Sequence, residues 1–373
     1  MKILVIGGMG VIGGAITEAA VRTGADVTVI GRRAASGKWK ELNVSFLQGD
    51  WFDDAFASGS VEQGFDVIVD TLIFDEKDMQ RSARIVNDHC KQLIYISTDS
   101  VYAHPNKDLS EDKEIALSDI EWKYGINKRK AELFLASHSE DYSFRWTVIR
   151  PTITFGDTRI PVGFSSRRGT YTLIDRIEKG KPVIRFDDNT RHAVCHSSVF
   201  GNAALSLFLN EKAYGRFYHI SDDISYTFDE IFSVIKSIIG KEPVFFHADA
   251  SILKKYNEDA YEDMIYDKNP EFTLDNSSIK SVCPGVSFHS DLKEVLNKTI
   301  DNLREHRNEN GEDKDYDLLS DLIILKSDPA SEYISGLSDE RIAEIKKYAS
   351  KAHSRNTSNK IKNTLRSIRR KLR

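Results

Sequence analysis

The chain has 373 residues, of which 40% are hydrophobic and 29% are charged, as expected for a soluble globular protein of about two domains. No apolar run reaches the roughly 20 residues that span a bilayer, and glycines interrupt the apolar N-terminus too early for a signal peptide, so we expect a cytoplasmic protein. The three cysteines are too few and too scattered for a disulfide framework or a zinc cluster.

Apolar, strand-like segments alternate with helix-like segments over the first 150 residues. The predicted strands are residues 2–7, 26–30, 44–47, 66–73, 92–97 and 146–150. Residues 12–23, between the first two, have apolar side chains at helical spacing. Nearly continuous apolar strands with helices between them predict a parallel sheet covered on both faces. We therefore expect an α/β, Rossmann-type doubly wound domain over residues 1–155.

The pattern loosens after residue 156. Shorter segments predict a smaller mixed α/β substrate-binding lobe over residues 156–304, with some of them returning to the first domain. The candidate elements are residues 170–179, 183–186, 197–209, 216–220, 227–239 and 243–247. Residues 305–317 are polar and acidic, as in a linker, and residues 318–373 predict a helical extension.

The C-terminal segment differs in charge from the rest of the chain. Residues 351–373 contain nine Lys or Arg and no Asp or Glu, whereas the remaining residues carry a net charge of −14. Ile361, Leu365, Ile368 and Leu372 follow one helical face. This amphipathic pattern predicts contact with an anionic membrane surface. RNA, the acidic body of this or a neighbouring subunit, or simply solvent are the alternatives.

Glycines gather where the first predicted strand meets the first predicted helix, in "GGMGVIGG". Glycines at this spacing allow a pyrophosphate to approach backbone N–H groups at a helix N-terminus. We therefore predict a dinucleotide site. The residues expected there are Gly7, Gly10, Val11, Ile12, Gly13, Arg32, Arg33, Asp50, Trp51 and Thr71, together with the tyrosine and the lysine described below.

The end of the second predicted strand bears on the choice of cofactor. It reads "VIGRR", with Gly31 where NAD-preferring sites usually have an acidic residue, followed by Arg32 and Arg33. Guanidinium groups suit a 2′-phosphate, so NADP is slightly favoured over NAD, although two solvated arginines would look the same. Asp50 is placed to accept a hydrogen bond from adenine, and equally suits a turn or a helix cap.

Three side chains later in the sequence form a pattern that predicts proton transfer. Thr98 follows a buried strand in "ISTDSVY", and Tyr124 and Lys128 are four residues apart, on one helical face. A phenol titrates near pH ~10, and a neighbouring ammonium lowers that pKa. The tyrosine can then move a proton while hydride moves to or from a nicotinamide, with the threonine hydroxyl holding the substrate oxygen.

This combination resembles the extended short-chain dehydrogenase/reductase superfamily, in particular the NAD-dependent epimerase/dehydratase family that acts on sugar nucleotides. The matching segments are "GGMGVIGG" (7–14), "ISTDSVY" (96–102), "YGINK" (124–128), "RPTITFG" (150–156) and "NTRHAVCHSSVFGNA" (189–203). The resemblance implies Thr98 as the catalytic hydroxyl, Tyr124 as acid/base and Lys128 as the residue that binds the nicotinamide ribose. It further implies that Arg191 contacts the diphosphate of a nucleotide sugar, and that the protein is a homodimer.

The residues after the fifth predicted strand bear on the reaction. Sugar 4,6-dehydratases typically read Thr-Asp-Glu where this chain has Thr98, Asp99 and Ser100. The acid is present and the base is missing, which favours an epimerase or a keto-sugar reductase. An atypical dehydratase, or a protein of this fold that binds RNA or membrane through its basic tail, are the alternatives, with nucleic acid the less expected partner. His192 and His196 lack a third ligand nearby, so no metal site is expected.

Overall fold

The computed structural model describes residues 1–35, 37–113, 115–166, 171–186, 189–307 and 312–371, the last of these (359–371) through their backbone alone. The chain folds into two compact units. The first unit is Met1–Gly156, Arg191–Tyr226 and Glu271–Asp291, and the second is Asp157–Thr190, Thr227–Pro270 and Leu292–Arg373. The chain therefore passes between the units several times.

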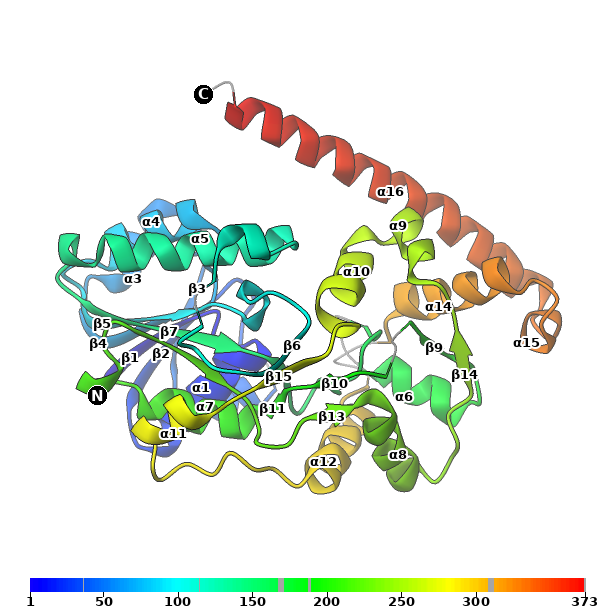
Figure 1. Cartoon of the computed structure of the whole chain (residues 1–373), viewed down its shortest axis with the longest axis horizontal. Coiled ribbons are helices and arrows are strands. Elements are labelled where there is room, and N and C mark those ends of the chain that lie inside the picture. Colours follow the sequence, from blue (N-terminus) through cyan, green and yellow to red (C-terminus); the bar gives the residue numbers. More distant parts are fainter. Residues whose placement is uncertain (36, 114, 167–170, 187–188, 308–311, 372–373) are drawn as a thin grey trace. The chain divides into compact units, whose positions relative to one another are not determined.

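A seven-stranded sheet lies at the centre of the first unit, in the order β12-β7-β5-β4-β1-β2-β3 (Figure 1). Its strands are β1 Lys2–Ile6, β2 Asp26–Gly31, β3 Ser45–Gln48, β4 Phe65–Asp70, β5 Cys90–Ile96, β7 Arg145–Pro151 and β12 Arg216–Ile220. Every neighbouring pair is parallel. This confirms the predicted Rossmann-type fold, with β12 as a later segment that returns to the sheet.

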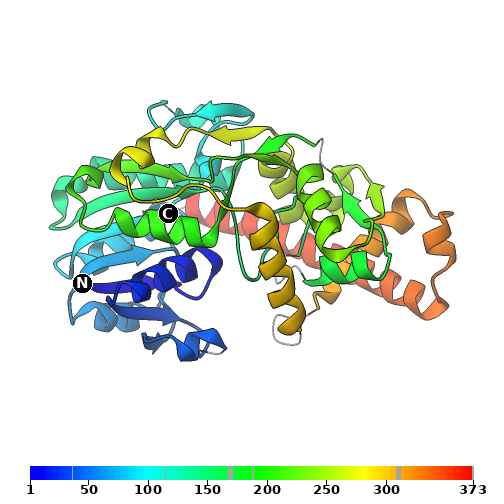
Figure 2. The same cartoon turned by 90° about the horizontal axis from the view of Figure 1, so that it is seen from below.

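Helices cover both faces of this sheet. They are α1 Val11–Arg22, α2 Lys38–Glu41, α3 Asp54–Val61, α4 Glu76–Val86, α5 Lys123–Ser137, α7 Ser197–Ser206 and α11 Ser277–Val282. α1 and α7 lie side by side on one face, and α3, α4 and α5 cover the other (Figures 1 and 2). Alternate residues of β1 enter the two cores: Ile3 and Val5 pack with α1 and α7, and Leu4 and Ile6 with the helices opposite.

In the described part of the chain, the remaining strands form three smaller sheets, and short helical turns lie between the longer elements. A four-stranded sheet has the order β13-β10-β15-β6, and two pairs are β11-β8 and β14-β9. Their bounds are β6 Asn106–Leu109, β8 Ile153–Phe155, β9 Val183–Arg185, β10 Arg191–His192, β11 Val194–His196, β13 Tyr226–Thr227, β14 Phe245–His247 and β15 Phe272–Leu274. The single turns are η1 Asp99–Val101, η2 Leu117–Asp119, η3 Ser139–Asp141, η4 Glu211–Ala213, η5 Ala250–Ile252 and η6 Met264–Lys268.

The second unit is mainly helical. Its helices are α6 Tyr171–Glu178, α8 Phe228–Ile239, α9 Leu253–Tyr256, α10 Glu258–Asp263, α12 Leu292–Glu305, α14 Lys314–Ser327, α15 Glu332–Ser335 and α16 Asp339–Lys371. α14 begins inside the segment predicted as a linker. Leu322 and Ile345, from the predicted extension, share one core with Phe164 and Ile184. The C-terminal helices are thus part of this unit.

Buried ion pairs fasten the C-terminal helices to α6. The guanidinium of Arg176 lies 2.9 Å from the Asp321 carboxylate of α14, and both side chains are fully buried. Arg341 of α16 donates to Asp321 at 2.9 Å. Asp321 thereby connects α6, α14 and α16. The apolar pattern of the sequence does not predict this connection.

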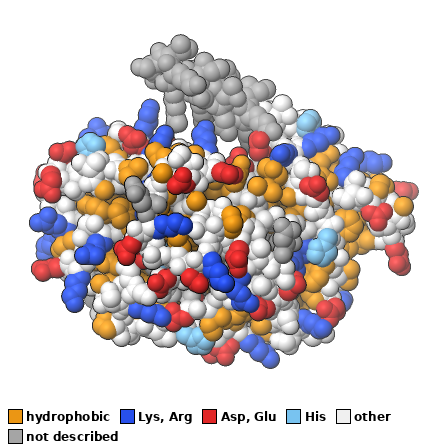
Figure 3. All heavy atoms as spheres, in the orientation of Figure 1, with side chains coloured by type: hydrophobic (Ala, Val, Ile, Leu, Met, Phe, Trp, Pro, Cys, Tyr) orange, Lys and Arg blue, Asp and Glu red, His pale blue; other side chains and the backbone are white. Residues whose placement is uncertain are grey.

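The surface and the C-terminal helix bear on the predicted membrane contact. Charged side chains of both signs are interspersed over the face seen in Figure 3. No helix among the described residues is long and apolar enough to cross a membrane. The side chains of the predicted stripe, Ile361 to Leu372, lie outside the described residues. Membrane contact through residues 351–373 therefore stays a prediction.

Candidate active site

The glycine loop lies at the carboxyl end of β1 and leads directly into α1. Gly7 has a φ of +79°, and a Cβ there would lie 2.2 Å from Oγ1 of Thr71, which donates to the Ile6 carbonyl at 2.8 Å. A Cβ on Gly13 would lie 2.5 Å from the Gly7 carbonyl oxygen. The backbone angle and the close packing of loop and helix therefore account for these two glycines.

Gly10 is not explained by packing. Its φ is −80°, which any residue adopts, and a Cβ there would meet only the Gly7 carbonyl oxygen, at 3.7 Å. It caps α1 without a side-chain hydrogen bond, where Ser or Asp would cap better. A ligand that approaches the first N–H groups of α1, among them those of Val11 and Ile12, does require the missing side chain. The loop therefore fits a pyrophosphate.

Gly10→Ala is expected to weaken dinucleotide binding by about tenfold or more, with the melting temperature nearly unchanged, because the added methyl group occupies ligand space only. Titration calorimetry with NAD and NADP, beside thermal unfolding, measures both quantities. Gly59→Ala is the matched control, since a Cβ on Gly59 of α3 would meet no atom within 4 Å. Equal affinity in Gly10→Ala and Gly59→Ala would show that the loop does not hold the cofactor.

The ends of β2 and β3 hold the other predicted cofactor residues. Arg32 and Arg33 are exposed after Gly31, and a Cβ on Gly31 would lie 2.8 Å from the Met9 methyl group, so Met9 takes part of the space of the usual acidic side chain. The preference for NADP that Arg32 and Arg33 indicate stays a prediction.

The segment after β3 forms a turn and a helix cap. The Asp50 carboxylate accepts the Phe52 N–H at 3.1 Å, and Asp53 is the residue that caps α3, accepting the Phe56 N–H at 2.9 Å. The indole of Trp51 is only 2% exposed and belongs to the core. Asp50 itself is exposed, and its contact with adenine stays a prediction.

The turn that carries Thr98 follows the end of β5. Thr98 caps η1: its Oγ1 accepts the Ser100 N–H at 3.2 Å, lies 3.0 Å from Ser100 Oγ, and donates to Oδ1 of Asp99 at 3.3 Å. Residues 97–100 are all buried. We refer to residues 97–102 as the Thr98 turn. The Thr98 hydroxyl is thus held by bonds within the turn itself.

Helix α5 lies directly against the Thr98 turn. A Cβ on Gly125 would lie 2.0 Å from the Ser100 carbonyl oxygen, so only glycine permits this approach. The contact brings the first turn of α5, with Tyr124, next to the Thr98 turn. The prediction from sequence missed Gly125, whose only signal is its place directly after Tyr124.

Lys128 of α5 forms hydrogen bonds to the segments that follow β4 and end β5. Its Nζ donates to the Ile73 carbonyl at 2.6 Å and to the Ile96 carbonyl at 2.9 Å, and lies 6.0 Å from the centre of the Tyr124 ring. Burial lowers the pKa of Lys128 to about 8, against the opposing pull of Asp70. An ammonium has three N–H groups, so one is left over from these two bonds. The structure thus gathers the predicted tyrosine, lysine and threonine at one edge of the sheet.

The comparisons with known proteins identify the family of the chain. The model of the NAD dependent epimerase/dehydratase family matches residues 3–194, more than half of the chain. The chain belongs to this family. The matched segment includes the glycine loop, the Thr98 turn, Tyr124, Lys128 and Arg191. No curated protein matches the chain.

Solved structures of similar fold include sugar-nucleotide epimerases. The UDP-glucuronic acid 4-epimerase of Bacillus cereus, with UDP-glucuronic acid and NAD, is 18% identical (TM-score 0.65; 82% of this chain and 99% of that chain covered). The UDP-glucose 4-epimerase of Thermotoga maritima, with UDP-glucose, is 21% identical (TM-score 0.63; 82% and 99%). An epimerase of Methanothermobacter thermautotrophicus is 14% identical (TM-score 0.64; 82% and 93%). At these identities the likeness shows the fold.

The remaining predicted residues of this epimerase/dehydratase family member lie on the smaller strands. Arg191, on β10, donates to the Ser225 carbonyl within the first unit, and its contact with a diphosphate stays a prediction. His192 is buried, and His196 caps α7, where its Nδ1 lies 2.8 Å from Ser198 Oγ. In the part of the chain that the structure describes, no group of three or more His, Cys, Asp or Glu is arranged to hold a metal ion.

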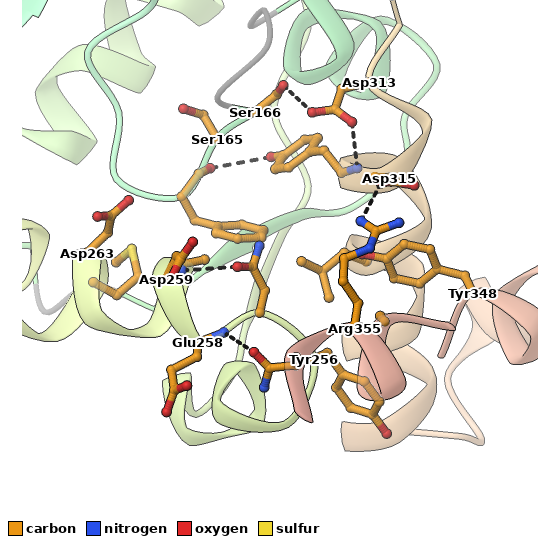
Figure 4. Close-up of a pocket in the computed structure, with 18 of the residues that line it drawn as sticks. Ser165, Ser166, Tyr256, Glu258, Asp259, Asp263, Asp313, Asp315, Tyr348 and Arg355 are labelled. Carbon is orange, nitrogen blue, oxygen red and sulfur yellow. Dashed lines mark hydrogen bonds and ion pairs between the residues drawn. The ribbon is translucent and has the colours of Figure 1, made fainter. Parts of the chain in front are cut away.

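A separate cavity of about 290 Å³ lies within the second unit (Figure 4). Its polar groups hold the lining together: Asp313 accepts the Ser166 hydroxyl at 2.5 Å, and Arg355 of α16 lies 3.3 Å from Asp315. None of the predicted site residues lines it. We therefore interpret this cavity as a consequence of the packing of α10, α14 and α16, and not as part of the candidate active site.

Proposed function

We propose that the protein epimerises a sugar carried on a nucleotide, or reduces a keto form of such a sugar, with a nicotinamide dinucleotide as cofactor. The observation that carries the proposal is the cluster of Thr98, Tyr124 and Lys128 in a member of this family. The B. cereus and T. maritima enzymes are UDP-sugar 4-epimerases by name. A UDP-sugar is therefore the first substrate to test.

The cofactor would be held by the glycine loop and by Lys128. The N–H groups at the start of α1, which Gly10 leaves uncovered, would bind the pyrophosphate. The remaining N–H of Lys128 would bind the nicotinamide ribose. When bound, the nicotinamide supplies or accepts hydride.

The proton would be handled by Tyr124. The Lys128 ammonium, 6.0 Å from the centre of its ring, favours the phenolate form and so lets Tyr124 exchange a proton with a sugar hydroxyl. The Thr98 hydroxyl would hold the same sugar oxygen, and the Asp99 carboxylate, 3.3 Å from Thr98 Oγ1, would orient that hydroxyl. Ser100 offers no base for removing water, which speaks against an ordinary dehydratase.

A panel of nucleotide sugars, followed by NMR with NAD, NADP and their reduced forms, identifies sugar and direction. An epimerase inverts one carbon with no net use of cofactor, whereas a reductase consumes the reduced cofactor in proportion to product. Turnover of no sugar nucleotide with any cofactor would refute the proposal. The homodimer stays a prediction from the sequence.

We propose NADP as the preferred cofactor on the strength of Arg32 and Arg33 alone, since the B. cereus structure contains NAD. The double variant Arg32→Ala/Arg33→Ala should bind NADP about tenfold more weakly and NAD nearly as well, because only NADP has a 2′-phosphate for the guanidinium groups. Titration of both cofactors measures this. An equal change for the two would contradict a contact between these arginines and the 2′-phosphate, and with it the proposed preference for NADP.

A further inference from the structure

We propose that Glu132, Arg150 and Tyr102 form a buried positioning chain that fixes helix α5 against the Thr98 turn. The inference rests on the proposed function and adds residues that act through Tyr124 and Lys128. None of the three has a role predicted from the sequence, although Tyr102 and Arg150 lie in segments that resemble the family.

Three side chains connect the helix to the turn. Glu132 is one helical turn after Lys128, and its carboxylate accepts two bonds from Arg150 of β7, at 2.9 Å from Nε and 2.7 Å from Nη2. Arg150 Nη1 donates to the Tyr102 hydroxyl at 2.8 Å. The N–H of Tyr102, the residue directly after η1, in turn donates to the Asp99 carbonyl at 2.9 Å. All three side chains are at most 2% exposed.

His219, beyond the Tyr102 end of the positioning chain, determines the direction of the hydrogen bonds of Tyr102. His219 Nε2 lies 2.7 Å from the Asp275 carbonyl oxygen, which only accepts, so Nε2 carries the proton. Burial lowers the pKa of His219 to about 4, so the ring is neutral and Nδ1 is an acceptor, to which the Tyr102 hydroxyl, 3.1 Å away, donates. The hydroxyl oxygen is left to accept from Arg150. The tyrosine thus has one defined role between two buried partners.

Stability alone does not account for this arrangement. Removing two charges from water costs free energy, and replacing a buried ion pair by apolar side chains of similar volume is often neutral or stabilising. A bidentate pair does give a defined orientation, which apolar contacts do not.

The proposed reaction requires a defined orientation of α5, because this helix carries Tyr124 and Lys128. The helix meets the Thr98 turn at Gly125, and Lys128 ties it to the Ile73 and Ile96 carbonyls. The link from Glu132 through Arg150 to Tyr102 adds a direct connection from α5 to the residue that ends the Thr98 turn, and so helps to fix where Tyr124 lies relative to Thr98. A displacement of about 1 Å at reacting groups can cost about 100-fold in rate.

Tyr102→Phe tests the link, because it removes one hydroxyl and keeps the ring. We expect kcat to fall about 10- to 100-fold, with KM and cofactor affinity within about threefold of the wild type, and faster amide hydrogen exchange in the first turn of α5. Arg150→Lys, which keeps the charge but not the bidentate geometry, should lose part of the activity. Tyr218→Phe is the matched control: its hydroxyl donates to the Lys212 carbonyl at 3.2 Å, and its ring belongs to the core on the side of α1 and α7, not to the core that contains α5.

The outcomes separate this inference from the function on which it rests. If Tyr102→Phe matches Tyr218→Phe in kcat and in exchange at α5, while the wild type is active and Tyr124→Phe is not, the positioning chain is refuted and the proposed function stands. If the wild type converts no nucleotide sugar, the function fails and the inference falls with it. Should Tyr102→Phe be unstable, Glu132→Gln, which keeps the shape of the side chain, is expected to show the same selective loss of kcat.

Discussion

Tyr124→Phe is expected to lower kcat by about 10²- to 10⁴-fold, the usual contribution of a positioned general acid or base. The variant loses only the group that exchanges a proton with the sugar. Its ring still packs on Trp122, whose ring centre is 5.0 Å away, so the helix start should be preserved. Steady-state kinetics, cofactor titration and thermal unfolding together distinguish loss of proton transfer from loss of structure.

Tyr142→Phe is the matched control for this experiment. Tyr142 also packs on an aromatic neighbour, the ring of Phe144 at 5.2 Å, but lies outside the site. It should retain wild-type kcat. Wild-type activity in Tyr124→Phe would remove the tyrosine from the mechanism, and with it the role of Lys128 in favouring the phenolate form.

Lys128→Met should be at least as damaging, because it removes both the ammonium beside Tyr124 and the donor for the ribose. We expect kcat to fall by about 10²-fold or more and cofactor affinity to fall as well. Lys130→Met, at an exposed lysine of the same helix, should change neither. A Lys128→Met variant with unchanged cofactor affinity would contradict the ribose contact.

The same variant has a pH signature in stability. The folded protein lowers the pKa of Lys128 from 10.5 to about 8, so between these values the unfolded chain binds a proton that the folded chain has released. The free energy of unfolding of the wild type should therefore rise with pH across this window, relative to Lys128→Met, by up to about 3 kcal/mol. Urea unfolding of both proteins at several pH values measures it. A constant difference would mean that Lys128 is not buried as described.

Local features of the sequence were sufficient to predict the sheet and to single out the residues that the fold brings together beside the Thr98 turn. Continuous apolar runs marked β1, β2 and β5, and Gly10, Tyr124 and Lys128 stood at spacings that a strand–loop–helix unit and one helical face impose. The predicted fourth strand extended to residue 73, whereas β4 ends at Asp70, whose carboxylate turns back to accept the Leu72 N–H at 2.8 Å.

Contacts between distant residues could not be predicted in this way. Arg150 meets Tyr102 across 48 residues, and Tyr102 meets His219 across 117. Arg176 and Asp321, which attach the C-terminal helices to α6, are 145 residues apart. Neither periodicity nor composition indicates which buried charge will face which partner, so these links appear only in the fold.

The most direct test of the central claim is whether a nucleotide sugar changes the redox state of the bound nicotinamide through Tyr124. The full-length protein, loaded in turn with each oxidised and reduced cofactor, is mixed with UDP-sugars, and the absorbance of the reduced nicotinamide is followed. We predict a sugar-dependent change in the wild type that is slower by about 10²-fold or more in Tyr124→Phe. In an epimerase this change is transient, because the cofactor is regenerated in each turnover. The same rate in both proteins, or neither an absorbance change nor an inverted or reduced sugar with any nucleotide sugar, would contradict the account.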